Sequence, residues 1–289
     1  MILNSTLLRG WAVGIWDAND FYLQYHTLTT DYARAGRFLH WDPWTNAGTA
    51  AAADPQTGAF SPVTFLVGLM TSRTSYGFIV YWLLMWWLGG FGMLMLARHL
   101  KAPAWGACAV ALGFLYCGFY TGHAQHTSAI AAFSFLPLLI WRLDVALLSG
   151  KRLPAVEAGA LLGLSALAGY PALIILNGCF CALWAAGRWL CAEETSSAES
   201  SGMEFQPDAS DAARPVDQLV SWRTVFSSLA LMLLVGIVIL SPTYFAFLYE
   251  GVGIQQRAGG VSLDAALVNS LHPGALATFA SPYMILLKS

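Results

Sequence analysis

Five aspartates stand in the polar stretch from residue 16 to residue 62, among aromatic residues, glycines and prolines: Asp17, Asp20, Asp31, Asp42 and Asp54. A carboxylate within hydrogen-bond reach of a substrate hydroxyl can accept its proton as a general base. Asp17 and Asp20 are three residues apart, so a helical turn would place both carboxylates on one face. The spacing predicts that one is the base and that the other binds a metal ion or a sugar hydroxyl. Asp17 is also suited to capping the helix that follows it.

Other polar residues add binding groups to this pair. Asp54 and Gln56 could bind sugar hydroxyls or a metal ion, although an aspartate before proline is also a common turn residue. His123 and His126 are three residues apart in a polar turn between two apolar runs. They could bind phosphate or a metal ion, or simply form hydrogen bonds at a membrane interface. Arg257 is a candidate phosphate partner, because a guanidinium group binds phosphate bidentately; a solvated loop arginine is the alternative.

The composition of the chain points to lipid as its solvent. Of 289 residues, 57% are hydrophobic and 10% are charged, and the mean hydropathy is +0.58. Ordinary soluble domains carry about 25% charged residues. The net charge of −2 gives no indication of nucleic-acid binding. The five cysteines lie in apolar runs or just beyond one, which favours buried small side chains over a disulfide or metal framework.

The apolar runs predict an all-α integral membrane protein, a polytopic helical bundle with about six crossings and a large, ordered first loop. Residues 1–75 form the loop region, with an amphipathic helix expected over 20–39 and a short apolar piece over 62–70. Residues 191–223 are rich in serine, alanine and glutamate and predict a disordered linker. The crossings expected within 76–190 and 224–248 span residues 76–97, 104–120, 128–148, 154–168, 171–187 and 224–247, and a polar segment follows at 249–289.

Lysine and arginine near the crossings predict the orientation of the chain. One side of the membrane would carry Arg98, Lys101, Lys151, Arg152, Arg188, Arg214 and Arg223. By the positive-inside rule that side is cytoplasmic, together with the linker at 191–223. The first loop, the turn at 121–127 and the segment 249–289 are then extracytoplasmic. Arg34, Arg37 and Arg73 in the first loop weaken the asymmetry.

A series of short motifs resembles a known family. In chain order they are Asp20, Gly36, Trp41-Asp42-Pro43, Gly48, Ala53-Asp54-Pro55-Gln56, Ser61-Pro62, Gly122-His123, Phe135-Leu136-Pro137-Leu138, Gly169-Tyr170-Pro171, Leu271-His272-Pro273 and Ser281-Pro282-Tyr283. Their order and spacing resemble the YfhO-type family of bacterial membrane proteins over nearly the whole chain. That family is similar to the GT-C superfamily of membrane glycosyltransferases. Two departures concern the ends of the chain: the family begins with a spanning helix and is much longer, so we expect this chain to be truncated.

The resemblance implies a fold and an activity. It implies a GT-C-like bundle in the bacterial inner membrane, a polyprenyl-phosphate sugar as donor, and an acidic residue of the first outer loop at the active site. Asp20 occupies the position of that acid. Where family members often have Gly-His-Pro-Gln, this chain has Gly169-Tyr170-Pro171-Ala172, so no role for that histidine or glutamine carries over.

Three hypotheses follow from these patterns. The first is a glycosyltransferase that moves a sugar from a polyprenyl-phosphate donor to a cell-envelope acceptor, with Asp20 and Asp17 as catalytic acids. The second is a non-catalytic membrane scaffold or lipid-handling protein with the same fold. The third is an inactive fragment of a longer enzyme. The expected partners are the lipid-linked donor and the bilayer, without nucleic acid, and a divalent metal ion stays an open option.

Overall fold

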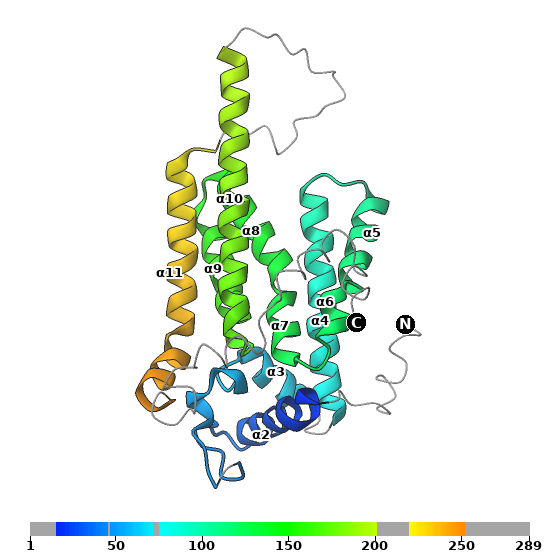
Figure 1. The fold of residues 1–289 in the computed structure, drawn as a ribbon, viewed down its shortest axis with the longest axis vertical. Coiled ribbons are helices and arrows are strands. Elements are labelled where there is room, and N and C mark those ends of the chain that lie inside the picture. Colours follow the sequence, from blue (N-terminus) through cyan, green and yellow to red (C-terminus); the bar gives the residue numbers. More distant parts are fainter. Residues whose placement is uncertain (1–15, 46, 72–74, 201–219, 252–289) are drawn as a thin grey trace, which may run out of the picture.

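The computed structural model describes residues 16–45, 47–71, 75–200 and 220–251 of the chain (Figure 1). In these ranges the regular structure is helical, apart from one isolated β-bridge between Asp42 and Thr49. Five helical segments are long and apolar enough to cross a membrane: Ser75–His99, Ala104–Gly122, Thr127–Ser149, Ala172–Leu190 and Trp222–Glu250. The prediction of an all-α, multi-pass membrane protein is therefore confirmed.

The helices of the bundle follow the predicted crossings closely. They are α4 (Ser75–His99), α5 (Ala104–Leu115), α6 (Gly118–Gly122), α7 (Thr127–Ser134), α8 (Leu136–Ser149), α9 (Arg152–Leu167), α10 (Pro171–Ser200) and α11 (Trp222–Ala246). Helices α5 and α6 make up one of the five spans, and α7 and α8 make up another. The proline in the first turn of α8 explains why that span is interrupted after α7.

Two helices differ in length from the prediction. The sixth expected crossing, residues 154–168, is α9, whose 16 residues make it shorter than each of the five spans. Helix α10 continues to Ser200, although the sequence predicts a disordered linker from residue 191. Alanine and glutamate in that segment are good helix formers, and they extend a helix that already exists more easily than they nucleate a new one.

Helix α9 is held against α11 by two glycines. A Cβ atom added at Gly159 would lie 2.6 Å from the carbonyl oxygen of Met232, and one added at Gly163 would lie 2.7 Å from Cβ of Ile239. Only glycine allows the two backbones to approach so closely. The Gly-x-x-x-Gly spacing in the sequence therefore does mark a helix–helix contact, and the two helices lie side by side in Figure 1.

Residues 16–71, which we call the cap, lie across one end of the bundle (Figure 1). The cap contains the π-turn Ala18–Tyr22, α2 (Leu23–Arg34), the 3-10 turns Ala51–Ala53 and Pro55–Thr57, and α3 (Pro62–Met70). Helix α3 has only nine residues, in agreement with a short, non-spanning apolar piece. The helix predicted over 20–39 ends five residues early, at Arg34.

A glycine explains that early end. Gly36 has φ of +67°, its N–H donates to the carbonyl of Ala33 at 3.0 Å, and the N–H of Arg37 donates to the carbonyl of Tyr32 at 2.8 Å. This pair of bonds is the Schellman arrangement that terminates helices at a left-handed residue. The chain therefore turns back after α2, and later cap residues, including Leu39 and Ala51, pack against this helix.

Helix α2 buries both of its faces, but not as an interfacial amphipathic helix would. Its apolar face, which includes Tyr25, packs against Leu39 and Ala51 of the cap itself. A neighbouring face carries His26 and Thr30, which are buried toward the bundle. The sequence predicts an amphipathic helix at the membrane interface; in the structure its apolar residues pack within the cap. The uncharged polar face is the one that meets the membrane helices.

The cap is joined to the bundle at the turn between α9 and α10. Gly169 has φ of +97°, and a Cβ atom there would lie 2.8 Å from the carbonyl oxygen of Gln56 and 2.9 Å from that of Pro55. Arg34 holds α2 to α3 from the side, because its guanidinium donates to the carbonyl oxygens of Gly68 and Thr71 at the end of α3. These contacts fix the position of the cap over the helix ends.

The far end of the bundle is tied together by a buried carboxylate. Asp144 in α8 is fully buried and accepts hydrogen bonds from Nε2 of His99 at 2.7 Å, Nε1 of Trp184 at 2.7 Å, and two guanidinium nitrogens of Arg188 at 2.6 Å each. These donors come from α4 and α10. A single carboxylate therefore connects three helices of the bundle.

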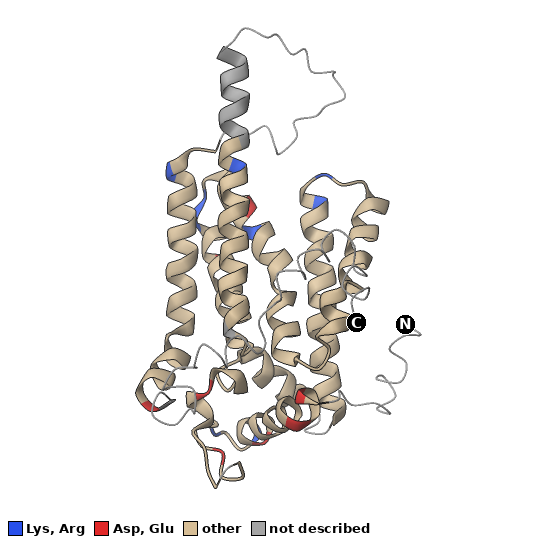
Figure 2. Cartoon of the chain, viewed as in Figure 1, with Lys and Arg blue, Asp and Glu red and all other residues tan. Residues whose placement is uncertain are grey.

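Charge is divided between the two ends of the molecule. Figure 2 shows the lysines and arginines of the bundle gathered at the end opposite the cap. All five aspartates of the polar stretch belong to the cap. This is the separation that the loop pattern predicts.

Candidate functional site

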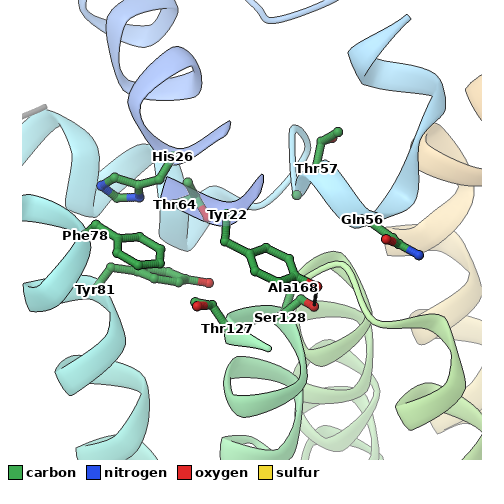
Figure 3. A pocket seen from close by; sticks show the side chains of 11 residues that line it. Tyr22, His26, Gln56, Thr57, Thr64, Phe78, Tyr81, Thr127, Ser128 and Ala168 are labelled. Atoms are coloured by element: carbon green, nitrogen blue, oxygen red, sulfur yellow. Dashed lines mark hydrogen bonds between the residues drawn. The ribbon is translucent and has the colours of Figure 1, made fainter. Parts of the chain in front are cut away.

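A small polar cavity of about 30 Å³ lies between the cap and the bundle (Figure 3). Its lining comes from the π-turn Ala18–Tyr22, α2, α3, α4, α7, the 3-10 turn Pro55–Thr57 with the glycine after it, and the residue that follows α9. The lining residues are Tyr22, His26, Gln56, Thr57, Gly58, Thr64, Phe78, Tyr81, Thr127, Ser128 and Ala168. None of them is a lysine, arginine, aspartate or glutamate, so the cavity is polar and uncharged.

His26 stands on the inner face of α2, between two aromatic rings of α4. Its ring centroid is 5.7 Å from those of Phe78 and Tyr81, and the residue is 4% exposed. Neither ring nitrogen has a hydrogen-bond partner within the described part of the chain. Burial disfavours the charged imidazolium and lowers the pKa of His26 from 6.5 to about 4. The imidazole is therefore neutral at physiological pH.

The first residues of α7 supply the opposite side of the cavity. Oγ1 of Thr127 is buried and has no hydrogen-bond partner among the described residues. The hydroxyl of Ser128 donates to the hydroxyl of Tyr22 at 2.7 Å. Burial, more than any charge, raises the pKa of Tyr22; the Ser128 bond opposes this, and the negative charges of Asp17 and Asp54 add to it. Two of the predicted acids thus lie close enough to influence the cavity.

Asp17 and the two histidines of the 121–127 turn come together in space, although more than a hundred residues separate them. A carboxylate oxygen of Asp17 lies 3.4 Å from Nε2 of His126, and Nδ1 of His126 lies 3.3 Å from Nδ1 of His123. The two nitrogens of His126 therefore face different partners. This geometry suits transfer or sharing of a proton along the row better than chelation of one ion.

The remaining predicted residues have different positions. Asp20 is exposed, and Nδ2 of Asn19 donates to its carboxylate at 3.0 Å. Asp54 accepts from the N–H of Gln56 at 2.9 Å and caps the 3-10 turn, so its turn role is confirmed, while burial raises its pKa. Gln56 is exposed at the rim of the cavity. Arg257 lies outside the described residues.

A second pocket of about 320 Å³ lies on the outer face of α2. It is lined by Leu23, Gln24, Tyr25, Thr27, Leu28, Asp42, Trp44 and Thr45. Asp42 is 4% exposed and accepts from the N–H of Trp44 at 2.9 Å, so it organises the loop, as the Trp-Asp-Pro-Trp segment suggests. The pocket is large enough for a small ligand. The charged residue that lines this pocket, Asp42, is already bonded to the N–H of Trp44, so we assign it no role in activating a ligand.

Within the described ranges, no cluster of three or more His, Cys, Asp or Glu side chains has the arrangement to hold a metal ion. Asp17, His123 and His126 form a row and do not converge on one point. We therefore assign no metal ligands.

Compared with protein-family models, curated proteins and solved structures, the chain matches none. The resemblance to YfhO-type and GT-C proteins described above consequently stays an expectation about this chain. The fold and the site must be interpreted from their own geometry.

Apart from Gln56, the side chains that line the cavity were not predicted from the sequence. His26 was overlooked because the polar face of α2 looks like a solvated face. A signal was available: Tyr22, His26, Thr29 and Thr30 recur at helical spacing without a charge among them. A solvated helix face normally carries charged residues. An uncharged polar stripe is more typical of a buried, polar contact.

The burial of neutral His26 has a consequence for the pH dependence of stability. The unfolded chain binds a proton on this histidine below pH 6.5, whereas the folded chain does so only below about 4. Lowering the pH through this window should therefore reduce the free energy of unfolding by about 3 kcal/mol in total. Comparing unfolding of wild type and His26→Phe in detergent between pH 4 and 7 isolates this effect. Equal pH dependence in the two proteins would contradict the assignment.

Proposed function

We propose that this protein is a membrane glycosyltransferase that moves a sugar from a polyprenyl-phosphate donor to an acceptor of the cell envelope. The observation that carries the proposal is the arrangement of the cap. Two of its acids, Asp17 and Asp54, stand beside an uncharged cavity at one end of a helical bundle whose cationic residues lie at the other end. A sugar on a lipid tether would reach this site from the membrane, and GT-C-like proteins are expected to work in this way.

The chemistry requires a base and a way to stabilise the leaving group. The acceptor hydroxyl oxygen attacks the anomeric carbon, the bond from that carbon to the phosphate oxygen breaks, and polyprenyl phosphate leaves. The proton of the acceptor hydroxyl passes to a carboxylate. Asp20, which matches the family's loop acid, is the leading candidate for this base. Asp17, beside His126, is the second, because the imidazole can take the proton onward.

The orientation of the chain is part of the proposal. If the cap is extracytoplasmic, a cysteine replacing exposed Ala35 in the cap should react with a membrane-impermeant maleimide added to intact cells. A cysteine replacing exposed Ser149, at the cationic end, should react only after the membrane is permeabilised. Native cysteines are replaced first, and permeabilised cells serve as the control for reactivity. The opposite labelling pattern would place the site on the wrong side for this function.

The activity itself is tested with a defined donor. Membranes containing the protein, and matched membranes without it, are given polyprenyl-phosphate carrying a radiolabelled hexose. The proposal expects release of polyprenyl phosphate and transfer of label to envelope material only when the protein is present. Labelled donor that stays intact in both samples, for each common hexose, would refute it.

A second candidate function has two observations in its favour. The cavity of about 30 Å³ is too small to enclose a whole sugar, and Asp20 is exposed outside it. Both fit a non-catalytic scaffold or lipid-handling protein. In that case the donor would bind to the purified protein without turnover, and substitution of the cap acids would leave its binding unchanged.

A further inference from the structure

We infer that the cavity around His26 binds an uncharged, hydroxyl-bearing group, such as the hydroxymethyl arm of a sugar, and does not bind the phosphate of a lipid donor. The inference rests on the proposed function for the identity of the whole substrate. It rests on the cavity alone for the chemistry of the bound group.

The first argument is the set of unpartnered groups. His26 and Thr127 come from elements far apart in the chain, each is at least nine-tenths buried, and both line the same cavity. A buried polar atom without a hydrogen bond costs folding free energy, so a protein rarely leaves two such groups at one place without a use for them. Together they offer an imidazole N–H, an imidazole acceptor nitrogen and a hydroxyl. A bound hydroxyl both donates and accepts, so it can bond one ring nitrogen of His26 and the hydroxyl of Thr127 at the same time.

The second argument concerns charge. The cavity has no cationic lining residue, and the pKa of His26, near 4, keeps that ring neutral. The carboxylates of Asp17 and Asp54 act on Tyr22 from nearby and would repel an anion. A site for a phosphate dianion normally contains arginine, lysine or several aligned donors. A neutral group is therefore the better fit.

The third argument concerns size and shape. A volume of about 30 Å³ accommodates one small group and leaves the rest of a sugar outside, toward exposed Gln56. Phe78 and Tyr81 present aromatic surface beside His26, as Figure 3 shows. Aromatic rings next to hydroxyl, amide and imidazole groups provide both an apolar surface and directional hydrogen bonds. That combination suits a carbon that carries a hydroxyl.

The test is direct binding of free sugars to the full-length protein in nanodiscs. Saturation-transfer NMR is recorded with D-glucose, D-mannose and N-acetyl-D-glucosamine, and inorganic phosphate is added as a competitor. We expect binding of at least one sugar that phosphate does not displace. His26→Phe should weaken this binding about tenfold, the loss expected for one buried hydrogen bond. His40→Phe, at an exposed histidine outside the cavity, is the matched control and should bind as wild type does.

Thr127→Val provides a second, independent variant. It removes an unpartnered hydroxyl and keeps the shape of the side chain, so the ligand-free protein should unfold at the same temperature or higher. Sugar binding should nevertheless weaken. If His26→Phe does not fold, Thr127→Val and Gln56→Ala decide the question. Displacement by phosphate, absence of binding for all three sugars, or unchanged binding in the cavity variants would overturn the inference.

The outcomes also separate this inference from the proposed function. Sugar binding that depends on His26, in a protein without transfer activity, would support the cavity assignment and remove the glycosyltransferase. Transfer activity that is unaffected in both His26→Phe and Thr127→Val would keep the enzyme and remove the cavity assignment.

Discussion

Replacing Asp144 by alanine is expected to lower the free energy of unfolding by about 3–5 kcal/mol, because it removes the buried carboxylate that pairs with the buried guanidinium of Arg188. In the native bundle the carboxylate is fully buried and receives hydrogen bonds from His99, Trp184 and Arg188. Its loss would release the contacts that join α4 and α10 to α8. Denaturant titration of the purified protein in mixed micelles measures the change.

The ion pair between Glu157 and Arg142 provides a matched control. Glu157 in α9 forms an ion pair with Arg142 of α8, but its side chain is 41% exposed. Exposed pairs of this kind contribute about 0–1 kcal/mol. Glu157→Ala should therefore change the unfolding midpoint only slightly. If both alanine variants had equal effects, the burial of Asp144 would not be the source of its contribution.

The second large effect is expected at the cap acids. In the donor assay, Asp20→Asn should reduce the rate of sugar transfer by about 10²–10⁴-fold, the contribution typical of a general base. The amide is close in size to the carboxylate but cannot accept the proton. Asp17→Asn should also lower the rate, because it removes the carboxylate beside His126.

The comparison acid is Asp31, which lies on α2 in the same cap and is not one of the predicted site residues. Asp31→Asn should transfer sugar at the wild-type rate. Unfolding curves for all three variants exclude loss of structure as the cause. Wild-type turnover in Asp20→Asn would move the catalytic role to the pair of Asp17 and His126, and wild-type turnover in both variants would remove the cap acids from the mechanism.

Local sequence patterns predicted the membrane helices well. Long apolar runs bounded by polar turns form α-helices in a bilayer, because a helix satisfies the backbone hydrogen bonds of such a segment internally. The Gly-x-x-x-Gly spacing at residues 159–163 likewise has a local meaning, since small residues on one face create a flat surface. The early end of α2 at Gly36 needed the actual backbone angle, which a sequence only suggests.

The site depended on contacts that no local pattern contains. The pairing of Asp17 with His126, and the contact of Gly169 with Gln56, join segments more than a hundred residues apart. Such contacts depend on how the bundle as a whole positions its turns. The sequence identifies Asp17, His123 and His126 individually as candidate residues, but only the fold places them in a row. His26 was hidden for the same reason, because its partners belong to α4.

The shortness of α9 sets the depth of the site in the membrane. At 1.5 Å per residue its 16 residues extend about 24 Å, whereas the hydrocarbon core of a bilayer is about 30 Å thick. In a bilayer, a helix this short would place the turn at Gly169, and the part of the cap that rests on it, at a point of hydrophobic mismatch. We expect the bilayer to thin around this point, or the polar turn to sink into the leaflet between the longer neighbouring helices. In either case the headgroup of a lipid could meet the protein without its chain leaving the membrane.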